Sequence, residues 1–204
     1  KSFPELQENI SHNMSPMATI AKRIKEKDPE AKTVFIGPCT AKKGEFQLPE
    51  VHKYVDCVLT FEELQAMFDS RELDVGAMEE TVLNNASGYG RIFAHCGGLA
   101  EAAAEALKEQ GIDFELKPLS CNGIEECKLA LMKAARGKLD ANFVEGMACV
   151  GGCVNGAGCM THNERNRVKV DAHSQQAQLK SITDSLLYAA EIDRELKEKA
   201  GDKA

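Results

Sequence analysis

The stretch Glu145-Gly-Met-Ala-Cys149-Val-Gly-Gly-Cys153-Val-Asn-Gly-Ala-Gly-Cys159 places three cysteines and five glycines within fifteen residues. Thiolates are the usual protein ligands of iron–sulfur clusters. Glycines let the backbone approach a bulky group and direct its N–H groups at anionic sulfides. Cys149 and Cys153 alone could be two small buried residues on one helix face, but Gly151 and Gly152 between them disfavour a helix. The segment therefore predicts a metal or cluster site.

Composition is consistent with an intracellular metal or redox protein. The chain has eight cysteines in 204 residues, but its length and helical patterns make a disulfide scaffold unnecessary, so we expect reduced thiols. No apolar run approaches the length of a membrane span and no signal sequence opens the chain, which predicts a cytoplasmic protein without a membrane partner. The formal net charge of −7 argues against nucleic acid as a partner.

Short apolar runs alternate with helical patterns along the chain. Ser15-Pro16 predicts the start of a helix that ends near Asp28, and Thr60 with Glu63 forms a capping box for another. Further helices are expected over 99–109 and 122–137, the latter capped by Asn122 with Glu125. Strands are expected over 33–37, 57–60, 91–95, 114–119 and 141–146. This alternation predicts an α/β fold with a mostly parallel sheet and flanking helices.

Three of the predicted strands lead into cysteines. Cys39 follows the strand over 33–37, which has no polar alternation and is expected to be covered on both faces. Cys96-Gly97-Gly98 follows the strand over 91–95, and Cys149 follows the last strand. Ligands of parallel sheets bind beyond the carboxyl ends of the strands, so we expect these cysteines to converge.

The C-terminal segment has a different character. From about Ser174 to Lys199, apolar residues recur at helical spacing among charged ones, which predicts a C-terminal helix docked on the domain; a coiled coil or a partner-binding helix is the alternative. We expect one partial domain over 1–173 and this helix over 174–204. The start at Lys1-Ser-Phe-Pro, without an initiator Met, indicates a piece of a longer polypeptide whose site is incomplete.

Two segments carry a resemblance to a known family. Phe35-Ile-Gly-Pro38-Cys39-Thr-Ala-Lys42-Lys43-Gly-Glu45 and the stretch from Glu145 to Gly158 resemble the second and third signature motifs of the iron-only (di-iron) hydrogenases. They occur in the family's order, about 110 residues apart. The segments 56–60 and 93–103 resemble connecting parts of the same catalytic domain, so the likeness spans roughly residues 1–158.

The resemblance implies the C-terminal part of a hydrogenase catalytic domain, which interconverts protons plus electrons with dihydrogen. Its cofactor would be a 4Fe-4S cluster joined to a di-iron centre with carbon monoxide, cyanide and dithiolate ligands. By position, the cluster ligands would be Cys39, Cys149 and Cys153, with Cys153 bridging the two parts; Lys42 would hydrogen-bond a cyanide; and Pro38, Gly97, Gly98 and Met147 would line the cofactor. The implied partners are an electron carrier such as ferredoxin and maturation proteins.

Departures from the family pattern indicate a divergent subgroup. The first signature motif, with the fourth cluster cysteine, would precede Lys1, so the isolated fragment is expected to be folded, inactive and mostly free of cofactor, with the loop from Val150 to Asn163 mobile or rearranged. Gly37 stands where the family usually has Met. A hydrogen or redox sensor, or an iron–sulfur assembly factor, is the alternative to catalysis, and a zinc-binding domain is disfavoured because the thiols form no paired C-x-x-C knuckles.

Several candidate residues stay open. Cys159 could contact the cluster, relay a proton or fill space. His95 and Cys96 are interpreted as pocket lining, and His162 as a surface residue. The remaining thiols show no ligand spacing and are interpreted as buried apolar residues: Cys57, Cys121 and Cys127.

Overall fold

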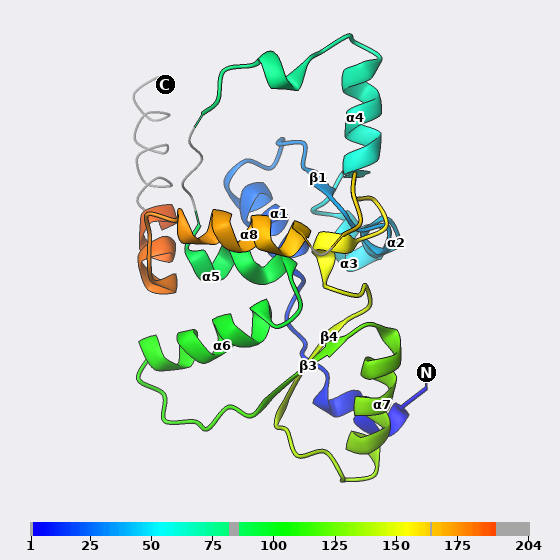
Figure 1. Cartoon of the computed structure of the whole chain (residues 1–204), viewed down its shortest axis with the longest axis vertical. Helices are drawn as coiled ribbons and strands as arrows, with labels where there is room; N and C mark the ends of the chain where they lie inside the picture. Colours follow the sequence, from blue (N-terminus) through cyan, green and yellow to red (C-terminus); the bar gives the residue numbers. More distant parts are fainter. Residues whose placement is uncertain (1, 82–85, 164, 191–204) are drawn as a thin grey trace. The chain divides into compact units, whose positions relative to one another are not determined.

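A computed structural model describes residues 2–81, 86–163 and 165–190 (Figure 1). The chain forms two compact units. Unit 1 comprises Lys1–Glu79 and Cys153–Asn163, and unit 2 comprises Glu80–Gly152 and Glu164–Ala204.

Unit 1 contains a two-stranded parallel sheet with several short helices. Strands β1 and β2 are in register from Val34 opposite Cys57 to Gly37 opposite Thr60. The described elements of unit 1 are η1 (Pro4–Asn9), α1 (Pro16–Lys27), β1 (Val34–Gly37), α2 (Ala41–Glu45), α3 (Pro49–His52), β2 (Cys57–Thr60), α4 (Phe61–Asp69), η2 (Val75–Ala77) and η4 (Cys153–Asn155).

The predicted helix starts of unit 1 are confirmed. The Ser15 side chain accepts a hydrogen bond from the Ala18 N–H, with Pro16 in the first turn of α1. At α4, Thr60 and Glu63 form both hydrogen bonds of the predicted capping box. These caps satisfy backbone donors that a helix start otherwise leaves unpaired.

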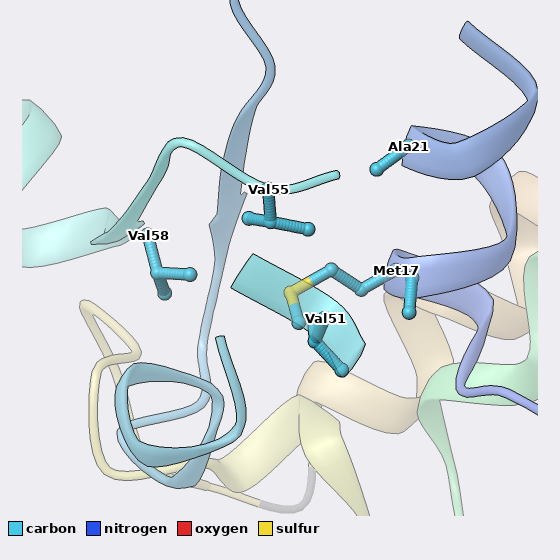
Figure 2. Close-up of a cluster of buried hydrophobic side chains, with 6 residues drawn as sticks. Met17, Ala21, Val51, Val55 and Val58 are labelled. Carbon is cyan, nitrogen blue, oxygen red and sulfur yellow. The ribbon is translucent and has the colours of Figure 1, made fainter. Parts of the chain in front are cut away.

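The core of unit 1 lies between α1 and the segment from α3 to β2. Figure 2 shows the buried cluster of this core, with the side chains of Met17, Ala21, Val51, Val55 and Val58. Small and β-branched side chains fill this space and remove apolar surface from water. The expectation that β1 is covered on both faces is wrong, because Val34 is 50% exposed and Ile36 is 42% exposed.

Unit 2 contains a second two-stranded parallel sheet, with α7 connecting its strands. Cys121 lies opposite Gly146 in the register of β3 and β4. Helix α8 lies alongside α5 (Figure 1). The described elements of unit 2 are α5 (Gly88–Arg91), η3 (Ile92–Ala94), α6 (Gly98–Glu109), β3 (Pro118–Asn122), α7 (Ile124–Ala135), β4 (Phe143–Met147) and α8 (Arg165–Gln175), followed by helical residues 182–190.

Two of the predicted strands differ from the structure. The strand over 91–95 is wrong: the Ser87 hydroxyl accepts from the Gly90 N–H and starts α5, and the chain continues into η3. The apolar run there is short, and the side-chain cap closes a helical turn instead. The strand expected over 114–119 is displaced to Pro118–Asn122, where it pairs with β4.

Two predicted helices also differ from the structure. Helix α7 begins after Gly123 rather than at an Asn122–Glu125 cap, and Glu126 accepts the Asn122 N–H at 2.8 Å. The expected continuous helix from 174 is interrupted, since α8 ends at Gln175 and the next helix begins at 182. The part of the expected helix over 191–199 lies outside the described residues.

The C-terminal helix docks on α6 within unit 2, as predicted. Glu109, the last residue of α6, accepts the N–H groups of Ile182 and Thr183 at 2.8 Å each and the Thr183 hydroxyl at 2.7 Å. One carboxylate therefore fixes the start of the helix over 182–190 to the end of α6.

The α/β class with parallel strands and flanking helices is confirmed. The described strands form two separate two-stranded sheets rather than one. The division into 1–173 and 174–204 stays a prediction. Within the described part of the chain, no helix is both long and apolar enough to span a bilayer.

Candidate metal centre

The first predicted ligand lies where a parallel strand ends. Strand β1 ends at Gly37, and Pro38 and Cys39 form the turn before α2. Cys39 is a free, half-buried thiol. Its position after the carboxyl end of β1 confirms this part of the predicted arrangement. A half-buried thiol at this position can bind a metal without disrupting β1.

The loop that carries Cys153 packs against this turn within unit 1. The Gly158 N–H donates to the Pro38 carbonyl at 2.9 Å, and the Gly156 N–H donates to the Cys153 carbonyl at 2.9 Å. A Cβ atom on Gly156 would collide with the Pro38 carbonyl oxygen, and one on Gly158 would lie 2.6 Å from the Thr60 Cβ. Glycine is therefore required at both positions for the loop to approach the turn.

The Lys42 ammonium, predicted to face a cyanide ligand, has an anionic partner on its own helix. Its Nζ donates to one carboxylate oxygen of Glu45, and the Ser15 hydroxyl donates to the other. The side chains of Lys42 and Glu45 are 22% and 25% exposed. This network holds the ammonium in place on the helix that follows Cys39, where it remains partly accessible.

Cys149 belongs to unit 2, where it follows β4 as predicted. Strand β4 ends at Met147, and the half-buried thiol of Cys149 comes two residues later. The loop is held by two hydrogen bonds: the Gly152 N–H donates to the Cys149 carbonyl at 3.0 Å, and the Gly151 N–H donates to the Asn122 side-chain oxygen at 2.5 Å.

Glu145 is a site residue that the sequence reasoning missed. It is only 2% exposed, and its two oxygens accept the N–H groups of Gly97 and Ala100 at 3.0 Å each. The Ser120 hydroxyl also donates to it, at 3.4 Å. A carboxylate at the start of α6 is stabilised by the helix dipole and fixes the Gly97-Gly98 turn. A lone acidic residue within an otherwise apolar strand was the available signal.

Cys96 and His95 do not follow a strand, because η3 precedes them. Burial and the nearby Glu145 charge hold the pKa of the Cys96 thiol above its ordinary value. His95 lines a pocket of about 410 Å³ in unit 2, with Nε2 3.1 Å from an Asp171 carboxylate oxygen and Nδ1 3.0 Å from the Cys96 carbonyl. None of the predicted cofactor residues lines this pocket, so the interpretation of His95 as lining of the cofactor site stays a prediction.

The thiol of Cys159 closes the loop that follows Cys153. It is buried, 7% exposed, and donates to the Val154 carbonyl at 3.3 Å and to the Cys153 carbonyl at 3.6 Å. Of the roles left open for Cys159, space filling with a structural hydrogen bond is the one that these contacts support. His162 is exposed, as expected of a surface residue.

The donor set fits an iron–sulfur cofactor in its chemistry. Cys39, Cys149 and Cys153 are half-buried cysteines outside any disulfide, and thiolate is the ligand that iron–sulfur clusters use. The backbone that carries Cys153 approaches the Cys39 turn through positions where only glycine fits. Over 2–81, 86–163 and 165–190, no three His, Cys, Asp or Glu side chains lie together as a metal-ion site. Convergence of the three sulfurs within one cluster's reach stays a prediction.

The fold and the site together define a class of protein: an α/β protein in which two thiol-bearing loops each follow a parallel strand. The family model described as the iron-only hydrogenase large subunit, C-terminal domain, matches residues 1–157. The chain therefore belongs to the iron-only hydrogenase large-subunit family.

Curated relatives agree with this assignment. The chain is 29% identical to Iron hydrogenase 1 of Clostridium pasteurianum, over 91% of this chain and 38% of that protein. It is 30% identical to the Periplasmic Fe hydrogenase large subunit of Nitratidesulfovibrio vulgaris, over 76% and 47%. It is also 28% identical to a Probable cytosolic Fe-S cluster assembly factor of Anopheles gambiae, over 67% and 37%. The chain spans less than half the length of these relatives.

Solved structures share the fold. An FeFe-hydrogenase studied for its oxygen inactivation superimposes with a TM-score of 0.68 at 19% identity, over 94% of this chain and 66% of that chain. A variant of FeFe-hydrogenase HydA1 from Chlamydomonas reinhardtii gives a TM-score of 0.64 at 20% identity, over 88% and 64%.

Proposed function

We propose that the protein containing this chain interconverts protons plus electrons with dihydrogen. The observation that carries the proposal is the packing of the Cys153 loop on the Cys39 turn, through the Gly158 N–H and the Pro38 carbonyl. These two segments come from the two cysteine motifs of the family and are 114 positions apart in the sequence, 153 minus 39. A backbone contact that tolerates only glycine is what a shared cofactor pocket needs.

The cofactor is a 4Fe-4S cluster joined to a di-iron centre that bears carbon monoxide, cyanide and a dithiolate. When bound, it supplies the hydrogen-activating chemistry. Cys39, Cys149 and Cys153 would hold it, with Cys153 bridging its two parts. Around it the lining would come from Pro38, Met147, Gly97 and Gly98.

Lys42 has a definite role in this proposal. An ammonium is a strong hydrogen-bond donor to an anionic ligand, and Glu45 holds its position while Ser15 orients Glu45. With this support, the Lys42 side chain does not have to be ordered again when a cofactor binds, which lowers the entropic cost of binding.

Glu145 would preorganise the lining that Gly97 and Gly98 contribute. The carboxylate fixes the backbone of this turn from a buried position. Its two hydrogen bonds make the turn rigid before any cofactor is present, so the glycine backbone can lie against a cofactor without rearranging.

We also propose that the protein exchanges electrons with a carrier such as ferredoxin, depends on maturation proteins for its cofactor and acts in the cytoplasm. The alternative function is non-catalytic: a hydrogen or redox sensor, or an iron–sulfur assembly factor. The similarity to a relative with that last description supports it, and in that case the same thiols would hold a cluster without turnover.

The test uses the full-length protein after maturation. We expect infrared bands from bound carbon monoxide and cyanide, and hydrogen evolution with a reduced electron donor. Cys153→Ser should lose both, whereas Cys57→Ser, at the start of β2, should keep both. Bound iron without these bands and without hydrogen evolution in the wild-type protein would support the assembly-factor function instead.

A further inference from the structure

Two thiols outside the proposed cluster ligands lie next to each other in unit 2. Cys121 is near the end of β3 and is 2% exposed. Cys127 is in the first turns of α7 and is partly exposed. Both were interpreted from the sequence as separate buried apolar residues, because a spacing of six residues matches no ligand motif.

The register of the sheet brings the two sulfurs to one face. Cys121 is the register partner of Gly146 on β4, so side chains at these two positions point to the same side of adjacent strands, which are about 4.8 Å apart. A Cβ atom on Gly146 would lie 3.3 Å from the Cys127 Sγ. The Cys127 sulfur therefore lies over the position beside Cys121, in the space that the missing side chain of Gly146 leaves open.

The pKa of the Cys121 thiol is consistent with this proximity. After burial, the neighbouring Cys127 thiol is the next cause that holds the pKa of Cys121 above its ordinary value. Cys127 is the more accessible thiol and Cys121 the more deeply buried one. This is the arrangement of an attacking thiol and a resolving thiol.

The pair is in contact with the segment that leads to Cys149. The Cys127 thiol lies 3.8 Å from the Met147 carbonyl, which also accepts the Gly123 N–H at 2.8 Å. A change at Cys127 therefore reaches the last residue of β4 directly.

We propose that Cys121 and Cys127 are a redox-active pair that forms a reversible disulfide with a low-molecular-weight disulfide such as oxidised glutathione. The Cys127 thiolate attacks one sulfur of the oxidant and releases the first glutathione thiolate. The Cys121 thiolate then attacks the Cys127 sulfur of the mixed disulfide and releases the second. Two protein thiols are oxidised, one glutathione disulfide is reduced to two thiols, and the two protein protons end on these thiols.

Disulfide formation would remove the Cys127 S–H donor from the Met147 carbonyl and tie α7 to β3. The pair would thus report the thiol redox state at the base of the loop that carries Cys149. This inference does not depend on the proposed hydrogenase activity, since it concerns only thiols and backbone of unit 2.

The experiment uses the reduced full-length protein, treated anaerobically with oxidised glutathione, alkylated and digested with a Glu-specific protease. Glu125 and Glu126 lie between the two cysteines, so cleavage there separates them unless a disulfide joins them. We expect a Cys121–Cys127 linked peptide pair that dithiothreitol abolishes, with loss of alkylation at both positions. The linked pair should persist in Cys57→Ser and be absent from Cys127→Ser.

The wild-type digest decides the matter without any variant, so a folding defect in Cys127→Ser does not affect it. A stable glutathione adduct on Cys127 without the linked pair would overturn the proposal. So would full alkylation of both thiols after oxidation, or a disulfide between Cys121 and Cys96 in place of Cys127.

Discussion

At the scale of single residues, the candidate site depends on glycines, which lack a side chain, as much as on the carboxylate of Glu145. Gly156 and Gly158 let the Cys153 loop reach the Pro38 carbonyl, and Glu145 fixes the Gly97 turn from a buried position. The sequence predicted the glycine-rich approach from residue type alone. A lone acidic residue in an apolar strand marks Glu145 as unusual, but its role was not predictable, because it depends on which N–H groups of a distant helix face the carboxylate.

Replacing Gly156 with Ala should loosen the loop that carries Cys153. The added Cβ would collide with the Pro38 carbonyl, and overpacking at a buried position typically costs about 1–3 kcal/mol. We expect a lower urea midpoint for unfolding of unit 1 and weaker iron retention by the matured full-length protein. Gly44→Ala is the matched control: nothing lies within 4 Å of its added Cβ, and Ala favours a helix over Gly by up to about 1 kcal/mol. Equal midpoints for the two variants would contradict the steric argument.

Replacing Glu145 with Gln should destabilise the start of α6. The amide keeps one acceptor oxygen but directs an NH₂ group at a backbone donor of Gly97 or Ala100, which then stays unpaired. Hydrogen bonds to a charged group contribute about 1.5–3 kcal/mol, so we expect a loss of about 2 kcal/mol. Hydrogen exchange at the Gly97 and Ala100 amides should become faster, while Glu125→Gln, exposed in the same unit, should leave it unchanged. Unaltered exchange in Glu145→Gln would refute this role.

At the scale of elements, the starts of α1 and α4 were predictable, whereas the start of α7 and the strands expected over 91–95 and 114–119 were not. Ser15-Pro16 and the Thr60–Glu63 capping box determine their helices through contacts within four residues, so the local sequence contains the whole signal. The run over 91–95 has strand-like residues but lies beyond a Ser87 cap that starts α5. Strand formation needs a partner strand, which the local sequence does not specify.

Asp56 should make the stability of unit 1 depend on pH. A hydrogen bond from the Thr33 N–H at 2.8 Å and the Lys25 ammonium at 2.9 Å lower its pKa from 3.8 to about 2. Because the folded state lowers this pKa, the stabilisation is fully present above the unfolded value of 3.8 and is lost as the pH falls toward about 2. Asp56→Asn should therefore be less stable than the wild type at neutral pH.

The measurement is urea unfolding of both proteins at several pH values. The difference in unfolding free energy should shrink between pH 3.8 and about 2, and Glu62→Gln, exposed on α4, should show no such trend. A difference that is constant across this range would mean that the Asp56 carboxylate does not titrate as the structure requires.

At the scale of the whole molecule, the chain forms two units, and the predicted ligands come from both. Cys39 and Cys153 belong to unit 1, and Cys149 belongs to unit 2. The sequence predicted one sheet with converging strand ends, whereas the described strands form two separate pairs. Which strands share a sheet is decided by long-range pairing, and periodicity along the chain carries no information about it.

The alkylation of individual cysteines should report which of them bind a cofactor. A thiolate is alkylated according to its exposure and pKa, and a thiolate bound to iron is protected. In the full-length protein without its cofactor, iodoacetamide should modify half-buried Cys39, Cys149 and Cys153 readily. Buried Cys121 and Cys159 should react slowly, as should Cys96, whose pKa is raised by burial and by Glu145.

After maturation, Cys39, Cys149 and Cys153 should become protected together, while half-buried Cys57 keeps its reactivity and serves as the internal control. Mass spectrometry of the digested protein reads each position separately and needs no enzymatic activity. Protection of Cys149 and Cys153 with Cys39 still reactive would remove Cys39 from the ligand set, and protection of Cys159 along with the other three would give it a direct role at the cofactor.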